Sequence, residues 1–399
     1  MGRVALLLFL AAGCSFGSPQ SKPDGNVPGD GSDGPSCTPW MTRGGHIKDV
    51  CTTPTSGTRW EVSDVGGTYD TTDGSFAGGT APPSMLVGMG SEIKMRVVSV
   101  DSFRIDSSAT LRVVGPYPLL VLSASTIQVD GTLDVSSSRT RGKGAGANLD
   151  GCQLRYPGTG TANAGGGGGG GYAIGGAAGG TGSTGGTMNA GGMGTGSITR
   201  FQFVVGSGCG GGNGGSGTGA AAGGDGGGGV QLTAKTSITI TGTINAGGMG
   251  GEGALATGGG GGGGSGGYIG LDAPRVNAAA TATLAANGGG GGAGCQGTSA
   301  TPNVTAGEDG RADNTAAAGG SGAGCTNNGR NGGTGGVRSM SAAGPGTSNT
   351  SGSDGGGGGG GGGLGFVVVW APTTIDFDVK AGAVVTPRES LVTVIEKRP

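Results

Sequence analysis

The sequence predicts an all-β protein, a parallel β-helix or similar β-solenoid that carries long glycine-rich insertions. Three observations lead to this prediction. Glycine accounts for 106 of the 399 residues and is concentrated in unbroken runs, while only 12% of the residues are charged and 4% are aromatic. Short apolar stretches between the runs alternate with period two, as strands with one buried face do. These stretches are degenerate copies of one pattern of about twenty residues, the size of a single solenoid repeat.

Composition excludes several other classes of protein. There is no strict Gly-X-Y period and there are only 17 prolines, which excludes collagen. The low charge is unlike that of a disordered chain, and the few aromatic residues are too sparse for a broad globular core. A formal net charge of −2 gives no electrostatic footprint for nucleic acid, so no nucleic-acid partner is expected. What remains is a thin, elongated core with repeated local hydrogen bonding.

The repeated pattern begins with leucine or valine, has an alanine two positions later, and continues with two short alternating strands around a glycine or other small turn. Clear copies begin at Leu122, Leu232, Leu271 and Val369, and a looser copy begins at Val98. Stacking such units buries an apolar face that no single unit can bury alone. The side chains expected to face the core are Ile127, Val129, Leu133, Val135, Ile238, Ile240, Ile244, Val276, Leu284, Ala286, Ile375, Phe377 and Val379. The alternative is a β-sandwich of the same strands with disordered glycine-rich loops, which the recurrence of one motif disfavours.

The glycine-rich insertions span about 142–228, 247–267 and 288–364. A solenoid tolerates insertions of unequal length because they leave from one corner of a repeat. Two outcomes are open for them. They are disordered, or they hydrogen-bond to one another as extended chains, including threefold polyglycine helices, because backbones without Cβ atoms approach closely.

Seven cysteines are present, and six remain when Cys14 is set aside. An even number in an exported chain indicates disulfides, for which six cysteines allow 15 pairings. Proximity in the sequence suggests the pairs Cys37–Cys51, Cys152–Cys209 and Cys295–Cys325. The chain has no CxxC motif and its single histidine is His46, so we expect neither a metal site nor a cofactor.

The chain opens with MGRVALLLFLAAGC, in which a basic residue, an apolar stretch and small residues precede Cys14. This order indicates a secretory signal peptide at 1–13. The position of Cys14 resembles the lipobox of bacterial lipoproteins, with Ala11 where leucine is usual. The resemblance implies acylation of Cys14 and, with Ser15 next, sorting to the outer membrane, where we expect display at the surface. The alternative is a secreted or periplasmic protein.

Composition then divides the mature chain. Glycine, serine, proline and aspartate dominate up to residue 36, as in a flexible tether, and the region that follows has the least glycine. The expected organisation is a signal peptide at 1–13, a lipidated cysteine and linker at 14–36, an N-terminal cap at 37–95 and the glycine-rich solenoid at 96–399.

Catalytic motifs are weak. A GxSxG match places Ser265 in a glycine run, but a nucleophile elbow also needs a following helix and a histidine base. Glu308, Asp309 and Asp313 form an acidic patch that is best explained as a solvated turn.

The predicted function is a structural or adhesive surface lipoprotein without catalytic activity. Its expected partners are the membrane, through the lipid anchor, and extracellular polysaccharide or other surface proteins. Many β-helix proteins are polysaccharide lyases or hydrolases, so a carbohydrate-active enzyme is the alternative. Such a site needs carboxylates aligned on one face, and the best candidates are Asp376 and Asp378 with Asp130 or Asp134.

Overall fold

The computed structural model places all of its described residues in the second of the two units into which the chain divides, Thr38–Pro399. The described residues are 57–63, 65–89, 93–149, 152, 164–197, 205–215, 219, 221–295, 305–323, 325, 329–337, 343–350, 354–371, 377–387 and 393–395. Their regular secondary structure is β-strand, and no helix among them is of a length and hydrophobicity that would cross a membrane.

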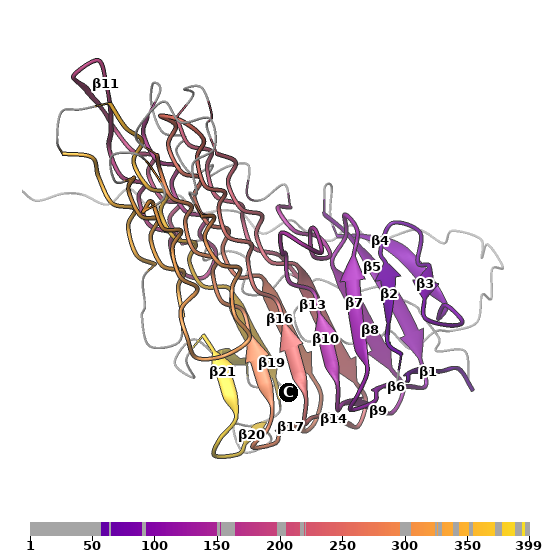
Figure 1. Cartoon of the computed structure of the whole chain (residues 1–399). Coiled ribbons are helices and arrows are strands. Elements are labelled where there is room, and N and C mark those ends of the chain that lie inside the picture. Colours follow the sequence, from indigo (N-terminus) through magenta and orange to yellow (C-terminus); the bar gives the residue numbers. More distant parts are fainter. Residues whose placement is uncertain are drawn as a thin grey trace, which may run out of the picture. The chain divides into compact units, whose positions relative to one another are not determined.

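Three large sheets, in which parallel pairing dominates, contain most of the strands (Figure 1). The first sheet has, in spatial order, β1 (Arg59–Val62), β6 (Ser102–Ile105), β9 (Thr126–Val129), β14 (Ser237–Ile240), β17 (Val276–Ala278) and β20 (Phe377–Val379). The second has β3 (Phe76–Ala77), β2 (Gly67–Asp70), β7 (Thr110–Val114), β10 (Thr132–Asp134), β15 (Thr243–Asn245), β18 (Thr283–Ala285) and β21 (Val384–Thr386). The third has β4 (Ser84–Met89), β5 (Ile93–Val100), β8 (Leu119–Ser123), β13 (Gly229–Ala234), β16 (Tyr268–Asp272), β19 (Phe366–Trp370) and β22 (Thr393–Ile395). A separate antiparallel hairpin joins β11 (Gly182–Thr184) to β12 (Thr187–Asn189).

The chain visits the first, second and third sheets in the same order in successive rounds. Each strand therefore pairs in parallel with its equivalent one round earlier and one round later. In the first sheet, for example, Ile238 lies opposite Ile127 on one side and opposite Val276 on the other. Only β3 and β4, at the N-terminal edges of two sheets, pair antiparallel within these three sheets. Parallel pairing of equivalent strands is not the arrangement of an antiparallel β-sandwich.

The inward side chains of the three sheets form one apolar cluster. The predicted core residues are buried in it, except that Phe377 and Val379 are partly buried against it and Ile375 lies outside the described residues. At the N-terminal end the cluster is aromatic, because the Trp60 ring lies 4.7 Å from that of Phe103 and 5.3 Å from that of Tyr69, measured between centroids. The period-two pattern therefore identified the buried face correctly.

One predicted register is wrong. The repeat alignment set Leu232 opposite Leu122, but Leu232 pairs with Val121. The small residue at this point in the first copy is Ser123, which lies opposite Ala234, and not Ala124. Serine is tolerated there because its buried hydroxyl hydrogen-bonds the carbonyls of Asp101 and Thr126 at 3.0 and 2.9 Å.

From β8 to β19, the third sheet is buried on both faces. Its outward side chains form a second apolar cluster with residues of the first insertion, including Tyr172, Val205 and Cys209. The Tyr172 ring meets the Phe366 ring edge-on at 4.8 Å between centroids. Burial on both faces explains why β8 and β19 are continuously apolar and do not alternate.

The long glycine-rich insertions all leave the sheets at the same connection, between a second-sheet strand and the next third-sheet strand. They separate β10 from β13, β15 from β16, and β18 from β19. Their described segments run side by side (Figure 1) and are joined by backbone hydrogen bonds. Of the two outcomes left open by the sequence, hydrogen-bonded extended chains are therefore what the described segments adopt. We call this array the glycine lattice.

Hydrogen bonding in the lattice repeats every three residues. In the run 258–264, the amides of Gly260 and Gly263 donate to the carbonyls of Gly357 and Gly360 at 2.9 and 2.8 Å. The intervening amides donate to two other segments, again with every third amide returning to the same one. A period of three is that of a polyproline-II-type chain, which has no internal hydrogen bonds and leaves its backbone groups for neighbours.

Cβ directions in the same run meet three further segments. A Cβ on Gly262 would lie 2.0 Å from the carbonyl oxygen of Gly168, and one on Gly263 would lie 2.1 Å from that of Gly289. Six neighbours thus surround this run, at the segments containing Gly168, Gly212, Asp225, Met249, Gly289 and Gly360. The interior positions must be glycine because each would-be side chain points into another backbone.

Peripheral lattice segments expose one position in three. In the segment 190–196, Ala190, Met193 and Gly196 are exposed, while the residues between them are buried or half-buried. The interior of the lattice is therefore mostly backbone, and in its peripheral segments every third residue is exposed.

Candidate functional site

A depression of about 650 Å³ lies where the first insertion leaves the sheets. Lys94, Tyr117, Lys143 and Asn148 contribute its polar lining, with Pro116 beside them. Its volume is within the range typical of ligand sites, roughly 300–1,000 Å³.

Different parts of the chain bring these side chains together. Lys94 is exposed on β5, and Tyr117 is half-buried in the short connection between β7 and β8. The amide of Tyr117 donates to the hydroxyl of Thr71 at 3.2 Å, which fixes that connection against the preceding round. Lys143 and Asn148 come from the start of the first insertion. The depression is therefore formed jointly by the sheets and by the insertion.

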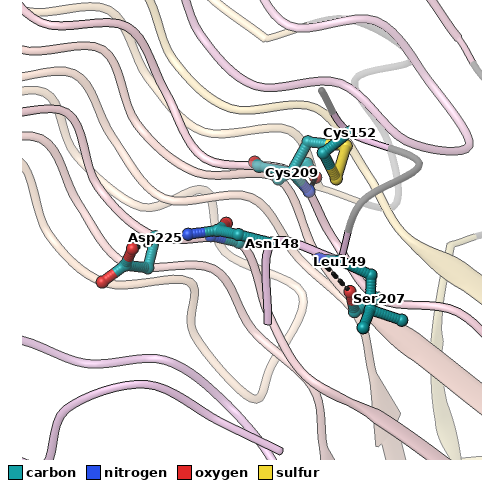
Figure 2. The surroundings of a disulfide bond; sticks show 8 residues. Asn148, Leu149, Cys152, Ser207, Cys209 and Asp225 are labelled. Carbon is teal, nitrogen blue, oxygen red and sulfur yellow. Dashed lines mark hydrogen bonds between the residues drawn. A yellow bond between two sulfur atoms is a disulfide. The ribbon is translucent and has the colours of Figure 1, made fainter. Parts of the chain in front are cut away.

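Asn148 and Asp225 join the wall of the depression to the glycine lattice (Figure 2). The Asn148 side chain donates to Asp225 Oδ1 at 2.6 Å and accepts from the amide of Gly226 at 2.9 Å. Asn148 has a φ of 61°, a left-handed conformation that asparagine tolerates better than most residues. The same Asp225 oxygen lies 3.1 Å from Lys143 Nζ. Asp225 thus holds both side chains in place.

Cys152 and Cys209 form a disulfide beside this wall, with their Cα atoms 5.3 Å apart (Figure 2). A second disulfide joins Cys295 to Cys325 with a Cα separation of 5.6 Å. Both pairs are those suggested by sequence proximity, and both lie within glycine-rich insertions. Cys14, Cys37 and Cys51 lie outside the described residues.

Ser265, the centre of the GxSxG match, is fully buried in the lattice. Its hydroxyl accepts a hydrogen bond from the Cys209 amide at 2.9 Å and donates to the Cys209 carbonyl at 3.4 Å. His46 is the only histidine of the chain and lies outside the described residues. In the structure, the Ser265 hydroxyl therefore satisfies backbone groups near a disulfide.

Carboxylates of the acidic patch are engaged by neighbouring groups. Glu308 is bound by Arg311 at 2.9 and 3.1 Å and accepts from the Ala318 amide at 3.0 Å, and these hydrogen bonds lower its pKa. Asp309 accepts from the amide of Gly250 at 3.0 Å, so it ties two insertions together. Across the described part of the chain, no group of three histidine, cysteine or acidic residues is arranged to hold a metal ion.

Of the carboxylates considered for an enzyme site, Asp134 and Asp378 lie in different sheets, and Asp376 lies outside the described residues. Asp378 lies opposite Asn277 in the first sheet, whereas Asp134 belongs to the second. Asp134 is only 1% exposed; Ser136 and Arg141, from the segment that follows β10, bind its carboxylate, which lies 3.2 Å from the Arg112 guanidinium. Asp130 binds Gln128 and Thr241 at 2.7 and 2.8 Å, at the corner of the first sheet.

The depression was not anticipated from the sequence, in which Lys143 is notable only for lacking the context of a phosphate-binding loop. Lys94 and Lys143 are far apart in the chain, and only the pairing of β5 with β8 and the path of the insertion bring them together. No local pattern marks such a site. Comparisons of this chain with protein-family models, with curated proteins and with solved structures find no match.

Proposed function

We propose that this protein is a cell-envelope-anchored β-solenoid with a structural or adhesive role and no catalytic activity. In this proposal the three sheets wind as a parallel β-helix, and the glycine lattice projects from one of its corners. The signal at 1–13 exports the chain, Cys14 carries the lipid, and the stretch up to residue 36 is the tether. The protein then resides at the outer membrane and faces outward.

The observation that carries the proposal is the construction of the glycine lattice. Its interior is mostly backbone, with runs such as 258–264 surrounded on six sides. At its periphery, in segments such as 190–196, every third position is exposed. A large ordered array of this kind suits the presentation of an extended surface, which is what scaffolding and contact between surfaces require.

Other features support export and an elongated assembly. Two disulfides cross-link segments of the insertions, and disulfides persist in oxidising compartments outside the cytosol. Parallel rounds leave a sheet edge open at each end, and antiparallel β3 and β4 alter two of the N-terminal edges. We assign the N-terminal region 37–95 the role of a cap on that basis.

Radiolabelled palmitate and intact-cell proteolysis test the anchoring. Wild-type protein should incorporate palmitate, fractionate with outer membranes and be cleaved by protease added to whole cells. The matched variant Cys14→Ser should lose the label and the membrane association, while Cys37→Ser should keep both. Unlabelled wild-type protein, or protein that is labelled but protected from protease until the cells are broken, would contradict surface anchoring.

A further inference from the structure

We propose that the depression lined by Lys94, Tyr117 and Lys143 binds an acidic sugar unit of a polysaccharide, with the carboxylate of the sugar held by the two ammonium groups. This inference rests on the adhesive role proposed above and gives it a ligand class.

Lys143 is prepared to receive an anion. Asp225 lies 3.1 Å from its Nζ, and Asp225 is itself fixed by the amide nitrogen of Asn148. An ammonium group has three donors, and one contact to Asp225 leaves others for a ligand. The Lys143 side chain is 62% exposed, so a ligand reaches it without opening the structure. Holding the amine in place beforehand reduces the entropy that binding would otherwise cost.

Asn148 supports the site by holding Asp225 in place. Its amide nitrogen is engaged by Asp225, and its oxygen accepts from the amide of Gly226. Both ends of the side chain are therefore used within the protein. The charge available to a ligand comes from Lys94 and Lys143, partly offset by Asp225, whose side chain is 22% exposed.

Tyr117 and Pro116 give the depression an apolar wall beside the two lysines. A pyranose ring has a face of C–H groups that packs on an aromatic ring, whose face carries the negative part of its quadrupole. A free inorganic anion would leave this wall unused. A neutral sugar would leave the ammonium groups without a charged partner. A sugar that bears a carboxylate uses both, through a charge-assisted hydrogen bond and ring packing.

Binding of polygalacturonate oligomers to the full mature chain, measured by calorimetry, tests the proposal. Neutral dextran oligomers and inorganic phosphate are the comparison ligands. Lys94→Gln and Lys143→Gln should each weaken polygalacturonate binding about tenfold, the loss expected for a hydrogen bond to a charged group. Tyr117→Ala should weaken it, and Tyr117→Phe should retain it.

Lys380→Gln is the matched control. Lys380 is also 62% exposed and paired with a carboxylate, at 2.6 Å from Asp378, but it directly follows β20, the edge strand at the C-terminal end of the first sheet. It should bind polygalacturonate as wild type does. Raising the salt concentration should weaken wild-type binding and have less effect on Lys143→Gln.

Three results would overturn the acidic-sugar site: no binding of polygalacturonate, equal binding of dextran, or equal losses in Lys380→Gln and Lys143→Gln. Binding of inorganic phosphate as tight as that of polygalacturonate would also overturn it, because the sugar ring would then contribute nothing. Failure of this site with intact palmitate labelling and surface cleavage leaves the anchoring in place, so the two proposals fail separately.

Discussion

Gly262 lies in the centre of the glycine lattice, and its replacement by alanine tests whether the interior tolerates any side chain. The added Cβ would lie 2.0 Å from the carbonyl oxygen of Gly168 and 2.5 Å from its carbon. Ordinary contact begins near 3.4 Å, so one backbone must move by about 1.4 Å. Neither backbone is free to move. Gly262 donates to Gly212 at 2.9 Å and accepts from Gly224 at 2.8 Å, while Gly168 accepts from Gly212 at 2.8 Å.

The expected loss follows from these contacts. Overpacking costs about 1–3 kcal/mol, and each hydrogen bond broken by the shift adds about 1 kcal/mol. Alanine restricts the unfolded chain more than glycine does, and this effect stabilises the folded state by about 0.4–1 kcal/mol. We therefore expect Gly262→Ala to lower the free energy of unfolding by about 3–4 kcal/mol. Equilibrium urea unfolding, followed by the fluorescence of the tryptophans, measures the change.

Gly336→Ala is the matched control for the same chemical change. A Cβ on Gly336 would approach nothing closer than 3.2 Å, at the Leu364 amide nitrogen, so a shift of a few tenths of an ångström suffices. We expect a change within about 1 kcal/mol of wild type. If Gly262→Ala were as stable as Gly336→Ala, close packing of backbones would not be the reason for the glycine runs.

Two further predictions concern charged groups. Asp134→Ala would leave the Arg112 guanidinium, 9% exposed, without its buried carboxylate, and should lower the unfolding free energy in urea by about 3–5 kcal/mol; a loss below about 1 kcal/mol would show that Asp134 is not needed to compensate it. Glu308 has a pKa lowered from its ordinary 4.5, chiefly by the hydrogen bonds from Arg311, so its contacts are present above the ordinary value and are lost as the pH falls through the lower folded-state pKa. The amide resonance of Ala318 should therefore shift with a midpoint below 4.5, and Glu308→Gln should abolish the transition; a midpoint at or above 4.5 would contradict the assignment.

Sequence periodicity predicted the strands well because every round buries one apolar face against the same core. Ile127, Ile238 and Val276 alternate with polar residues, and in the structure they lie opposite one another in one sheet. The same reasoning misplaced the start of the first copy by one residue, since serine and alanine are interchangeable at that small position. Proximity also sufficed for the described disulfides, because each joins segments of a single insertion.

Asp134 shows where strand alternation fails. It lies on the outward side of β10, which alternation assigns to solvent, but the segment that follows β10 turns back. Arg141 binds Asp134, and the carbonyls of Ser136 and Gly142 accept hydrogen bonds from Arg112. The depression was missed for a related reason, since its lysines meet only after the insertion has taken its path. Residues whose surroundings come from another segment leave no local pattern in the sequence.

The lattice did leave a signal, which is the spacing of the residues that are not glycine. The stretch 247–252 reads GGMGGE, and Glu252 is exposed while Met249 is half-buried. A side chain at every third position is what a threefold chain with one free face allows. Runs with no such exception, such as 258–264, are those with neighbours on every side. The positions of the residues other than glycine thus distinguish the periphery of the lattice from its interior.

Energetic considerations explain why the lattice is attached to sheets. Fixing the backbone of one residue costs about 1–2 kcal/mol, and glycine costs the most, while a hydrogen bond returns about 1 kcal/mol net. For a polyglycine array without side-chain burial, the entropy cost of ordering the backbone and the stabilisation from hydrogen bonds therefore nearly cancel. Because every insertion begins after a second-sheet strand and ends at a third-sheet strand, stacked rounds place all the insertions at the same corner. The apolar core of the sheets thereby reduces the entropy cost of assembling the lattice, and the two disulfides restrict the unfolded state further. The lattice should consequently lose order whenever the rounds beneath it come apart, whereas the sheets keep their own core when the lattice opens.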